Sequence, residues 1–204
     1  MHLMQIVIPA GESPGWLRAG MTRLFSAERR LLHRSVPAKE NTLAIRAAVE
    51  LRRTRPTFVA RTTVKGEPDA ALQTALARLA AYFDGDNREA VTLQTVRPVV
   101  MRPSAPGTWM VQIGLPGMYA ASAAPFPRSG KVRITAQLSE TLAIVRRSGR
   151  PKPQAIARAE AAIRTAIADS DWAAAGPSQL RLHAAPSLLS RTAWFEIAMP
   201  IEPK

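Results

Sequence analysis

The chain has 204 residues, no cysteine and a formal net charge of +13, from 28 Lys and Arg against 15 Asp and Glu. This length suffices for one domain with a buried core, and the lack of cysteine excludes disulfides, thiolate zinc sites and cysteine nucleophiles. The positive charge favours an anionic partner: nucleic acid, acidic lipid, or a ligand with carboxylates or phosphates. No apolar run approaches the roughly 20 residues that a membrane-spanning helix needs.

Residues 1–46 are predicted to be an N-terminal extension, and residues 47–204 the main domain. Within the extension, residues 16–34 predict a basic amphipathic helix, with Trp16, Met21 and Leu24 near one face and most arginines off it. Two interpretations remain open. The helix packs on its own domain or a second subunit, or it docks on a membrane surface or a protein partner.

Residues 1–16 lack the features of a signal peptide, so we expect a cytoplasmic location, with a membrane-peripheral one as the alternative.

The main domain divides into two similar halves. The first half predicts strands at 47–53 and 57–64, a helix at 68–83, and strands at 95–101 and 108–115. The second half predicts strands at 131–138 and 141–148, a helix from 153 to about 169, and strands at 179–185 and 193–200. Apolar residues recur at helical spacing in both helices and alternate in the strands. The sequence therefore predicts an α+β fold with two pseudo-symmetric ββαββ halves.

The segment Asp84-Gly85-Asp86-Asn87 follows the first predicted helix and admits two interpretations. A calcium loop needs more oxygen ligands at set spacing and a closing glutamate, and Glu89 is too near to be that residue. Glycine and asparagine accept the left-handed backbone that ends many helices. We therefore predict a helix stop and a turn here.

Several segments, taken in order and spacing, resemble the SOUL/haem-binding-protein family over about residues 48–202. They are ELRRTRPTFVARTTVKGEPDAALQTALARLAAYFDGDN, RPVV, WMVQIGLPGMY, PFP, LSETLAIVRRSGRP, LHAAP and FEIAMPI. The resemblance implies a distorted, barrel-like antiparallel β-sheet formed by the two halves, with two helices packed on it. This architecture is similar to the GyrI-like effector-binding domains of bacterial transcription regulators. The resemblance also implies that haem or another tetrapyrrole binds in an apolar cleft beside the first helix.

The candidate binding residues follow from that implied cleft. The first helix offers apolar and flanking positions, and arginines match the carboxylates of propionate groups. His183 is a possible axial iron ligand, whereas Arg53 stands where some family members carry a proposed axial histidine. Each candidate also has an interpretation without a ligand. The apolar stripe of the helix then forms core, the arginines lie in solvent and the histidine has a structural role. The candidates are Arg53, Gln73, Leu76, Ala77, Ala80, Arg97, His183 and Arg191.

The sequence predicts non-catalytic binding of haem or a related tetrapyrrole, as a carrier, buffer or sensor. One alternative is an interaction module that docks through the basic N-terminal helix and has a vestigial cleft. Another is a small-molecule-processing enzyme on the same fold, which would need a carboxylate or histidine with a shifted pKa in the cleft. Glu196 is a candidate for meeting a cationic ligand there, although the net charge favours an anionic one. Few aromatic residues lie in basic clusters, which argues against specific nucleic-acid binding.

Overall fold

The computed structural model describes residues 31, 35–38, 40–46, 48–119, 123–183 and 194–204. The predicted basic helix at residues 16–34 lies outside this part of the chain, except for Leu31, and so does Arg191. Leu31 is buried in the core, and its carbonyl accepts a hydrogen bond of 2.6 Å from Thr95 Oγ1. Among the residues that the structure describes, no helix is long and apolar enough to cross a membrane.

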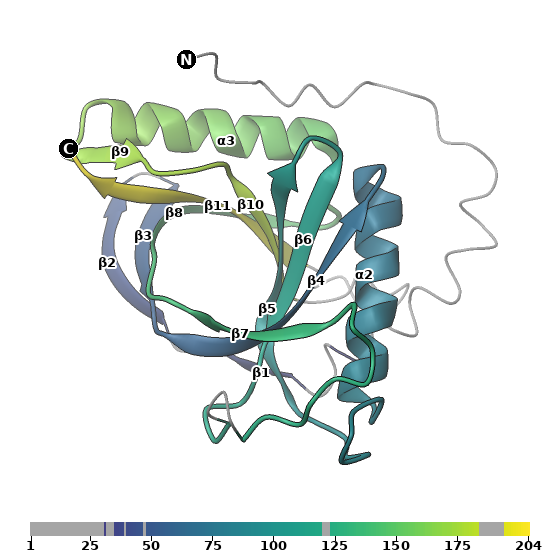
Figure 1. Cartoon of the computed structure of the whole chain (residues 1–204). Coiled ribbons are helices and arrows are strands. Elements are labelled where there is room, and N and C mark those ends of the chain that lie inside the picture. The colour runs from purple at the N-terminus through teal and green to yellow at the C-terminus, as the bar shows by residue number, and fades with distance from the viewer. Residues whose placement is uncertain (1–30, 32–34, 39, 47, 120–122, 184–193) are drawn as a thin grey trace.

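The described residues form one curled sheet and two helices (Figure 1). In chain order the elements are β1 (Ser35–Pro37), β2 (Glu40–Arg46), β3 (Val49–Thr54), β4 (Thr57–Lys65), α2 (Pro68–Phe83), β5 (Thr95–Ala105), β6 (Thr108–Gly114), β7 (Arg133–Gln137), β8 (Thr141–Ser148), α3 (Pro153–Ala168), β9 (Trp172–Ala174), β10 (Gln179–Leu182) and β11 (Trp194–Pro203). The predicted bounds of the first helix are confirmed, and the second helix ends at Ala168, one residue earlier than expected.

The strand order of the sheet displays the predicted internal symmetry. Hydrogen-bonded neighbours run β2-β3-β8-β11-β10-β5-β6-β4-β7, with β1 added beside β5 and β9 beside β11. From the β10–β5 pair outward, the order β10-β11-β8-β3 mirrors β5-β6-β4-β7. Each strand is thereby matched by the equivalent strand of the other half. The α+β prediction of two pseudo-symmetric ββαββ halves is confirmed.

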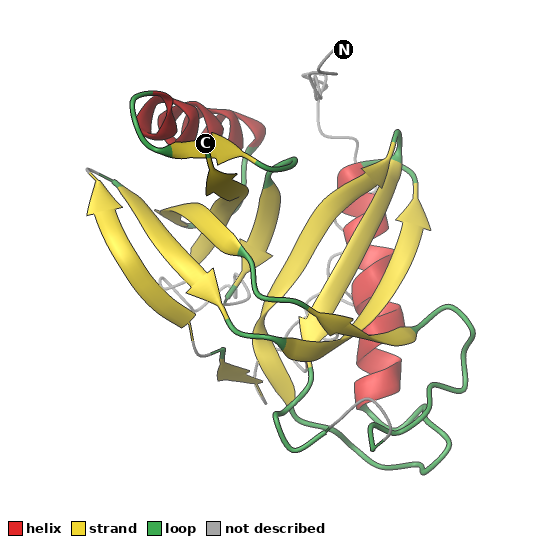
Figure 2. Cartoon of the chain, turned by 60° about the vertical axis from the view of Figure 1, so that its left-hand side comes forward, coloured by secondary structure: helices red, strands yellow, loops and turns green. Residues whose placement is uncertain are grey.

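Both helices lie on the outer face of the curled sheet (Figures 1 and 2). Helix α2 contacts β4 and β6, and α3 contacts β3, β8, β9 and β11. A proline stands at the start of each helix, where its missing N–H costs no hydrogen bond. The side of α2 that faces the sheet is formed by Ala75, Leu76, Leu79 and Phe83, each at most 1% exposed. The main core therefore lies between the helices and the outer face, which leaves the inner face for other uses.

The end of α2 confirms the predicted helix stop. Gly85 adopts a φ of +112°, a conformation that favours glycine. Asn87 is fully buried, and its Nδ2 donates to the carbonyls of Tyr82 at 3.1 Å and Val91 at 2.7 Å. Its Oδ1 accepts from the Val91 N–H at 3.1 Å. The asparagine thus ties the end of the helix to the segment that follows it.

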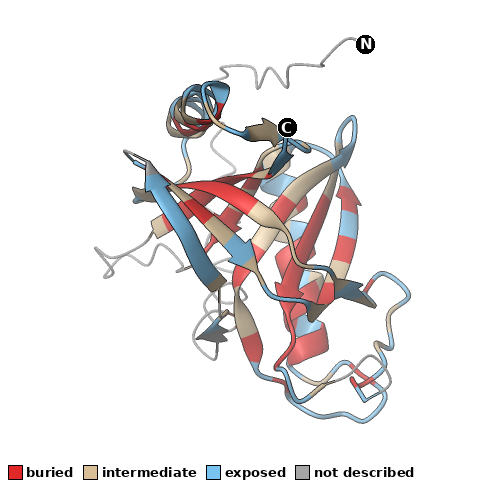
Figure 3. Ribbon diagram, turned by 90° about the vertical axis from the view of Figure 1, so that its left-hand side faces the viewer, coloured by how far each residue is buried: buried red, intermediate tan, exposed pale blue. Residues whose placement is uncertain are grey.

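Strands β1 and β2 lie within residues 1–46, the predicted extension, and were not predicted as strands. Strand β2 pairs antiparallel with β3, and β1 pairs parallel with β5. Figure 3 shows how exposed β2 is beside its neighbours, and Leu43 and Ile45 are 49% and 69% exposed. Because β2 is an edge strand with few buried side chains, its sequence has no clear alternation. The short strand β9 was also missed.

Candidate functional site

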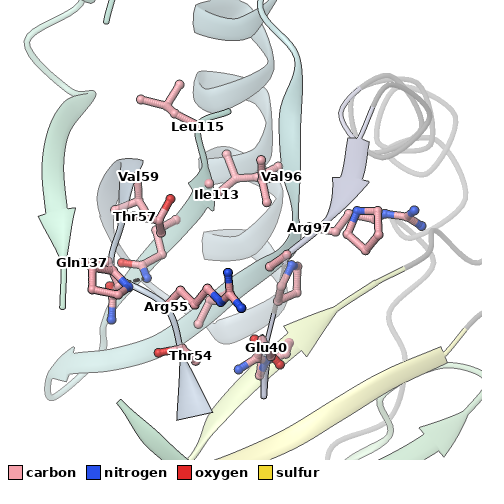
Figure 4. A pocket seen from close by; sticks show the side chains of 18 of the residues that line it. Glu40, Thr54, Arg55, Thr57, Val59, Val96, Arg97, Ile113, Leu115 and Gln137 are labelled. Atoms are coloured by element: carbon pink, nitrogen blue, oxygen red, sulfur yellow. Dashed lines mark hydrogen bonds and ion pairs between the residues drawn. The ribbon is translucent and has the colours of Figure 1, made fainter. Parts of the chain in front are cut away.

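The inner face of the sheet holds a cavity of about 430 Å³ (Figure 4). This volume is within the usual range for sites that bind small molecules. The lining comes from β4, β5, β6, β7 and β10, from the ends of β1, β2 and β3, and from the segments that follow β3, β6 and β7. It consists of Pro37, Ala38, Glu40, Thr54, Arg55, Pro56, Thr57, Val59, Val96, Arg97, Pro98, Val100, Gln112, Ile113, Gly114, Leu115, Pro116, Gly117, Gln137, Glu140, Gln179 and Arg181.

The walls of the cavity are largely apolar. Val59, Val96, Val100 and Leu115 all contribute to them. Gly114 permits a close approach of β6 to β5, because a Cβ there would lie 2.9 Å from Val96 Cβ. A larger residue would force the two strands apart. The cavity therefore depends on this glycine as well as on the valines.

Three amide side chains and three arginines also line the cavity. Gln112 Nε2 donates to Gln137 Oε1 at 2.7 Å. Gln179 is 4% exposed, and its Nε2 has no hydrogen-bond partner among the described residues. Arg97 lies where the β5–β6 register shifts, and its Nη1 donates to the carbonyl of His183 at 3.2 Å. Arg55 is exposed and reaches among the lining residues in Figure 4.

One wall of the cavity continues into a buried ion network, which comprises Glu40, Glu50, Arg52, Arg181, His183 and Glu196. Arg52 contacts Glu50 at 2.7 Å, Glu196 at 2.8 Å and Glu40 at 3.2 Å. Arg181 bonds to Glu40 and lies 3.3 Å from Glu196 through its Nε. Residues distant in sequence meet here because β10 pairs with β11 and the sheet curls β2 and β3 towards them.

The surroundings lower the pKa of two carboxyl groups of this network, Glu50 and Glu196. Burial opposes ionisation of Glu196, but the hydrogen bond from His183 and the positive charges of Arg181 and Arg52 outweigh it and lower the pKa of Glu196 to about 2. The hydrogen bond from Arg52 is the main reason that the pKa of Glu50 is also lowered. Burial lowers the pKa of His183 despite its contact with Glu196. These pKa shifts favour the ionised forms of Glu50 and Glu196 and the neutral form of His183.

His183 is held on several sides. Its Nε2 lies 2.8 Å from Glu196 Oε2, and its ring stacks on Trp194 with centroids 3.9 Å apart and planes 12° apart. The guanidinium carbon of Arg146 lies 3.7 Å from the Trp194 ring centroid, a cation–π arrangement. An imidazole bonded in this way is oriented by Glu196, which engages its Nε2.

The predicted binding residues are dispersed over the fold. Leu76 and Ala80 are 1% and 2% exposed and belong to the core beneath α2, whereas Gln73 is half-buried and Ala77 exposed on that helix. Arg53 is exposed and its Nε donates to Ser139 Oγ at 3.2 Å. Of the predicted residues that the structure describes, Arg97 alone lines the cavity. His183 lies beside it, through the Arg97–His183 hydrogen bond.

The three amides and most of the ion network were not predicted from the sequence, which indicated only His183 and Glu196 of that network. A local signal for part of the site exists in the segment 179–183. There Gln179, Arg181 and His183 alternate with Leu180 and Leu182, which predicts a strand with one polar face. Arg181 is buried at 3% exposure, so this polar face looks inward and not to solvent. Polar alternation in a strand next to the chain's apolar strands therefore indicates a binding surface.

Comparisons with known proteins agree on the fold. A family model described as SOUL heme-binding protein matches residues 39–185. The C-terminal domain of EcmrR is similar in structure, with a TM-score of 0.59 and 10% identity over 76% of this chain and 98% of that one. A hydrolase from Listeria innocua has a TM-score of 0.56 and 11% identity over 78% of this chain and 94% of that one. At such identities the solved structures show a shared fold alone. No curated protein sequence gives a significant match.

Proposed function

Because the chain belongs to the SOUL heme-binding protein family, we propose that it binds haem or a related tetrapyrrole without catalysing a reaction, as a carrier, buffer or sensor. We place the tetrapyrrole in the inner-face cavity. The observation that carries this choice is a single cavity that combines apolar walls with arginine side chains. A site beside α2, as the sequence analysis expected, is the rival location.

The residues of the cavity fit the two needs of a tetrapyrrole. The macrocycle needs apolar contact, which Val59, Val96 and Val100 supply. Its propionates need cations, and Arg55 and Arg97 are placed to pair with them. When haem is bound, its iron supplies the ligation and redox chemistry. We propose that affinity comes from the walls and the arginines, and that axial ligation by His183 is not required.

A haemin titration followed at the Soret band tests both the ligand and its location. Val100→Trp fills the cavity from β5, whereas Ala77→Trp adds the same ring on the exposed side of α2. We expect saturable one-to-one binding in the wild type, loss of that binding in Val100→Trp and no change in Ala77→Trp. The reverse pattern would place the ligand beside α2. Only non-saturable association in the wild type would show that the tetrapyrrole proposal is wrong.

Two further variants separate the proposed contributions to affinity. Arg97→Ala removes a cation from the lining and should weaken haemin binding. His183→Ala should leave the position of the Soret band unchanged, since His183 is bonded to Glu196 and not needed at the iron. A shifted band in His183→Ala would instead identify this histidine as the axial ligand.

A further inference from the structure

We infer that the cavity selects apolar ligands carrying an anionic or carbonyl oxygen at their buried end, and that Gln179, aided by Arg97, determines this selectivity. The inference rests on the cavity assigned above as the binding site. It concerns the chemistry of the ligand's buried end and does not require that the ligand be a tetrapyrrole.

The observation behind it is the set of polar atoms that the fold leaves without hydrogen-bond partners. In the described part of the chain, four buried side-chain atoms have none: Arg97 Nε, Gln179 Nε2, Arg181 Nε and Glu196 Oε1. Arg181 Nε and Glu196 Oε1 each lie in an ion pair, at 3.3 Å and 2.8 Å. The remaining two, Arg97 Nε and Gln179 Nε2, both belong to residues that line the cavity.

The chemistry of these two atoms indicates what they bind. Both are N–H donors, and a guanidinium group has no acceptor at all. A buried donor without a partner costs free energy, which a ligand oxygen can recover by accepting its hydrogen bond. In the β10–β11 ladder Gln179 faces Ala198, whose side chain offers no acceptor.

The two carboxylates that line the cavity already have cationic partners. Glu40 is bonded to Arg181 and Arg52, and Glu140 accepts from Arg102 at 3.4 Å. Gln137 accepts from Gln112. A ligand amine would therefore compete for carboxylates that already have cationic partners, whereas a ligand carboxylate, sulfonate or carbonyl oxygen meets donors that have none. The unpaired buried donors of the lining therefore favour a ligand oxygen.

A matched pair of fluorescent probes tests this selectivity. Anilinonaphthalene sulfonate and phenylnaphthylamine share an apolar skeleton, and only the first carries an acidic oxygen group. The proteins compared are the wild type, Gln179→Leu, and Gln73→Leu as the control, which removes an amide of the same kind from half-buried Gln73 on α2. Val100→Trp fills the cavity, so the probe fluorescence that this variant loses is the part that comes from the cavity.

We expect the wild type to bind the sulfonate more tightly in the cavity than the neutral probe. Loss of one hydrogen bond in Gln179→Leu should lower the affinity for the sulfonate about fivefold to tenfold and leave that for phenylnaphthylamine unchanged. Gln73→Leu should change neither. Three results would each overturn the inference. The first is an equal loss of affinity for both probes in Gln179→Leu, and the second is tighter binding of the neutral probe by the wild type. The third is probe binding that Val100→Trp does not reduce.

These results are independent of the haemin titration. If the sulfonate binds as expected and haemin does not, the tetrapyrrole proposal fails and the selectivity of the cavity stands. If haemin binds in the cavity and Gln179→Leu leaves the difference between the two probes unchanged, the proposed ligand stands and the role of Gln179 is wrong.

Discussion

The two halves of the molecule share one strand order but use their inner faces differently. In the first half, β4, β5 and β6 line an open cavity with valines and amides. In the second half, Leu142, Ile144 and Ala198 form a small closed cluster on β8 and β11, and the neighbouring Glu196 is fully buried in the ion network. The internal repeat therefore fixes the backbone, and the side chains of each half decide whether its inner face is open or filled.

The difference can be followed at equivalent strands. Strand β6 of the first half corresponds to β11 of the second in the mirrored sheet order. On β6 the cavity is bordered by Gly114, which has no side chain to fill it. On β11 the inner face carries Glu196, whose charge draws in Arg52 and Arg181. A small residue lets two strands approach closely beside the cavity in one half, and a charged residue gathers partners on the inner face in the other.

The largest expected effect comes from removing the central charge of the closed half. Glu196→Gln keeps the shape of the side chain but leaves the buried Arg52 and Arg181 with fewer negative partners. Removing one partner of a buried ion pair costs about 3–5 kcal/mol, so we expect a loss of that size in the free energy of unfolding, measured by urea denaturation. A loss below about 1 kcal/mol would mean that solvent screens these charges, as it does at surfaces.

A second prediction concerns the pH dependence of the same network. The pKa of His183 is lowered by burial from its ordinary 6.5, so the unfolded chain takes up this proton first and stability falls as the pH drops below about 6.5. The pKa of Glu196 falls from 4.5 to about 2, and this contributes about 3 kcal/mol of stability above pH 4.5 that is lost as the pH falls towards 2.

Urea denaturation at a series of pH values measures both steps. In Glu196→Gln the loss between pH 4.5 and pH 2 should be smaller than in the wild type, because the titrating group with the lowered pKa is gone. The same acid loss in both proteins would assign it to other carboxylates. Glu50, whose pKa is also lowered, would then be the first candidate.

The elements of both halves could be predicted from the sequence because their signals are local. Apolar spacing defines α2, and Pro68 and Gly85 mark its ends. Strand β2 gives no such signal, because an edge strand is stabilised by its neighbour more than by burial of its own side chains. Local patterns therefore predict the repeat, and they fail where an element depends on a partner.

The site was predictable only in part for the same reason. An apolar helix face such as that of Leu76 is typical of both a core and a binding cleft, and here it forms core. The ion network joins Glu40 to Arg181, which are 141 residues apart. Such a contact follows from the pairing of strands and the curl of the sheet, which no local pattern encodes. The alternation of Gln179, Arg181 and His183 was the one local indication of the inner face.

The smallest predicted effects compare two amides on the open inner face. Gln112 Nε2 has a protein partner in Gln137, whereas Gln179 Nε2 has none in the part of the chain that the structure describes. Gln112→Leu removes that hydrogen bond and should cost about 1 kcal/mol in the free energy of unfolding. Gln179→Leu removes a buried N–H group that has no partner among the described residues, so we expect no loss or a gain of up to about 1 kcal/mol.

Urea denaturation without ligand distinguishes the two variants. If Gln179→Leu is neutral or stabilising and Gln112→Leu is destabilising, the amide of Gln179 does not contribute to folding. That result is expected of a ligand-binding group. If Gln179→Leu costs as much as Gln112→Leu, Gln179 has a structural role. The first half would then resemble the second, with inner-face polar groups that serve the fold and not a ligand.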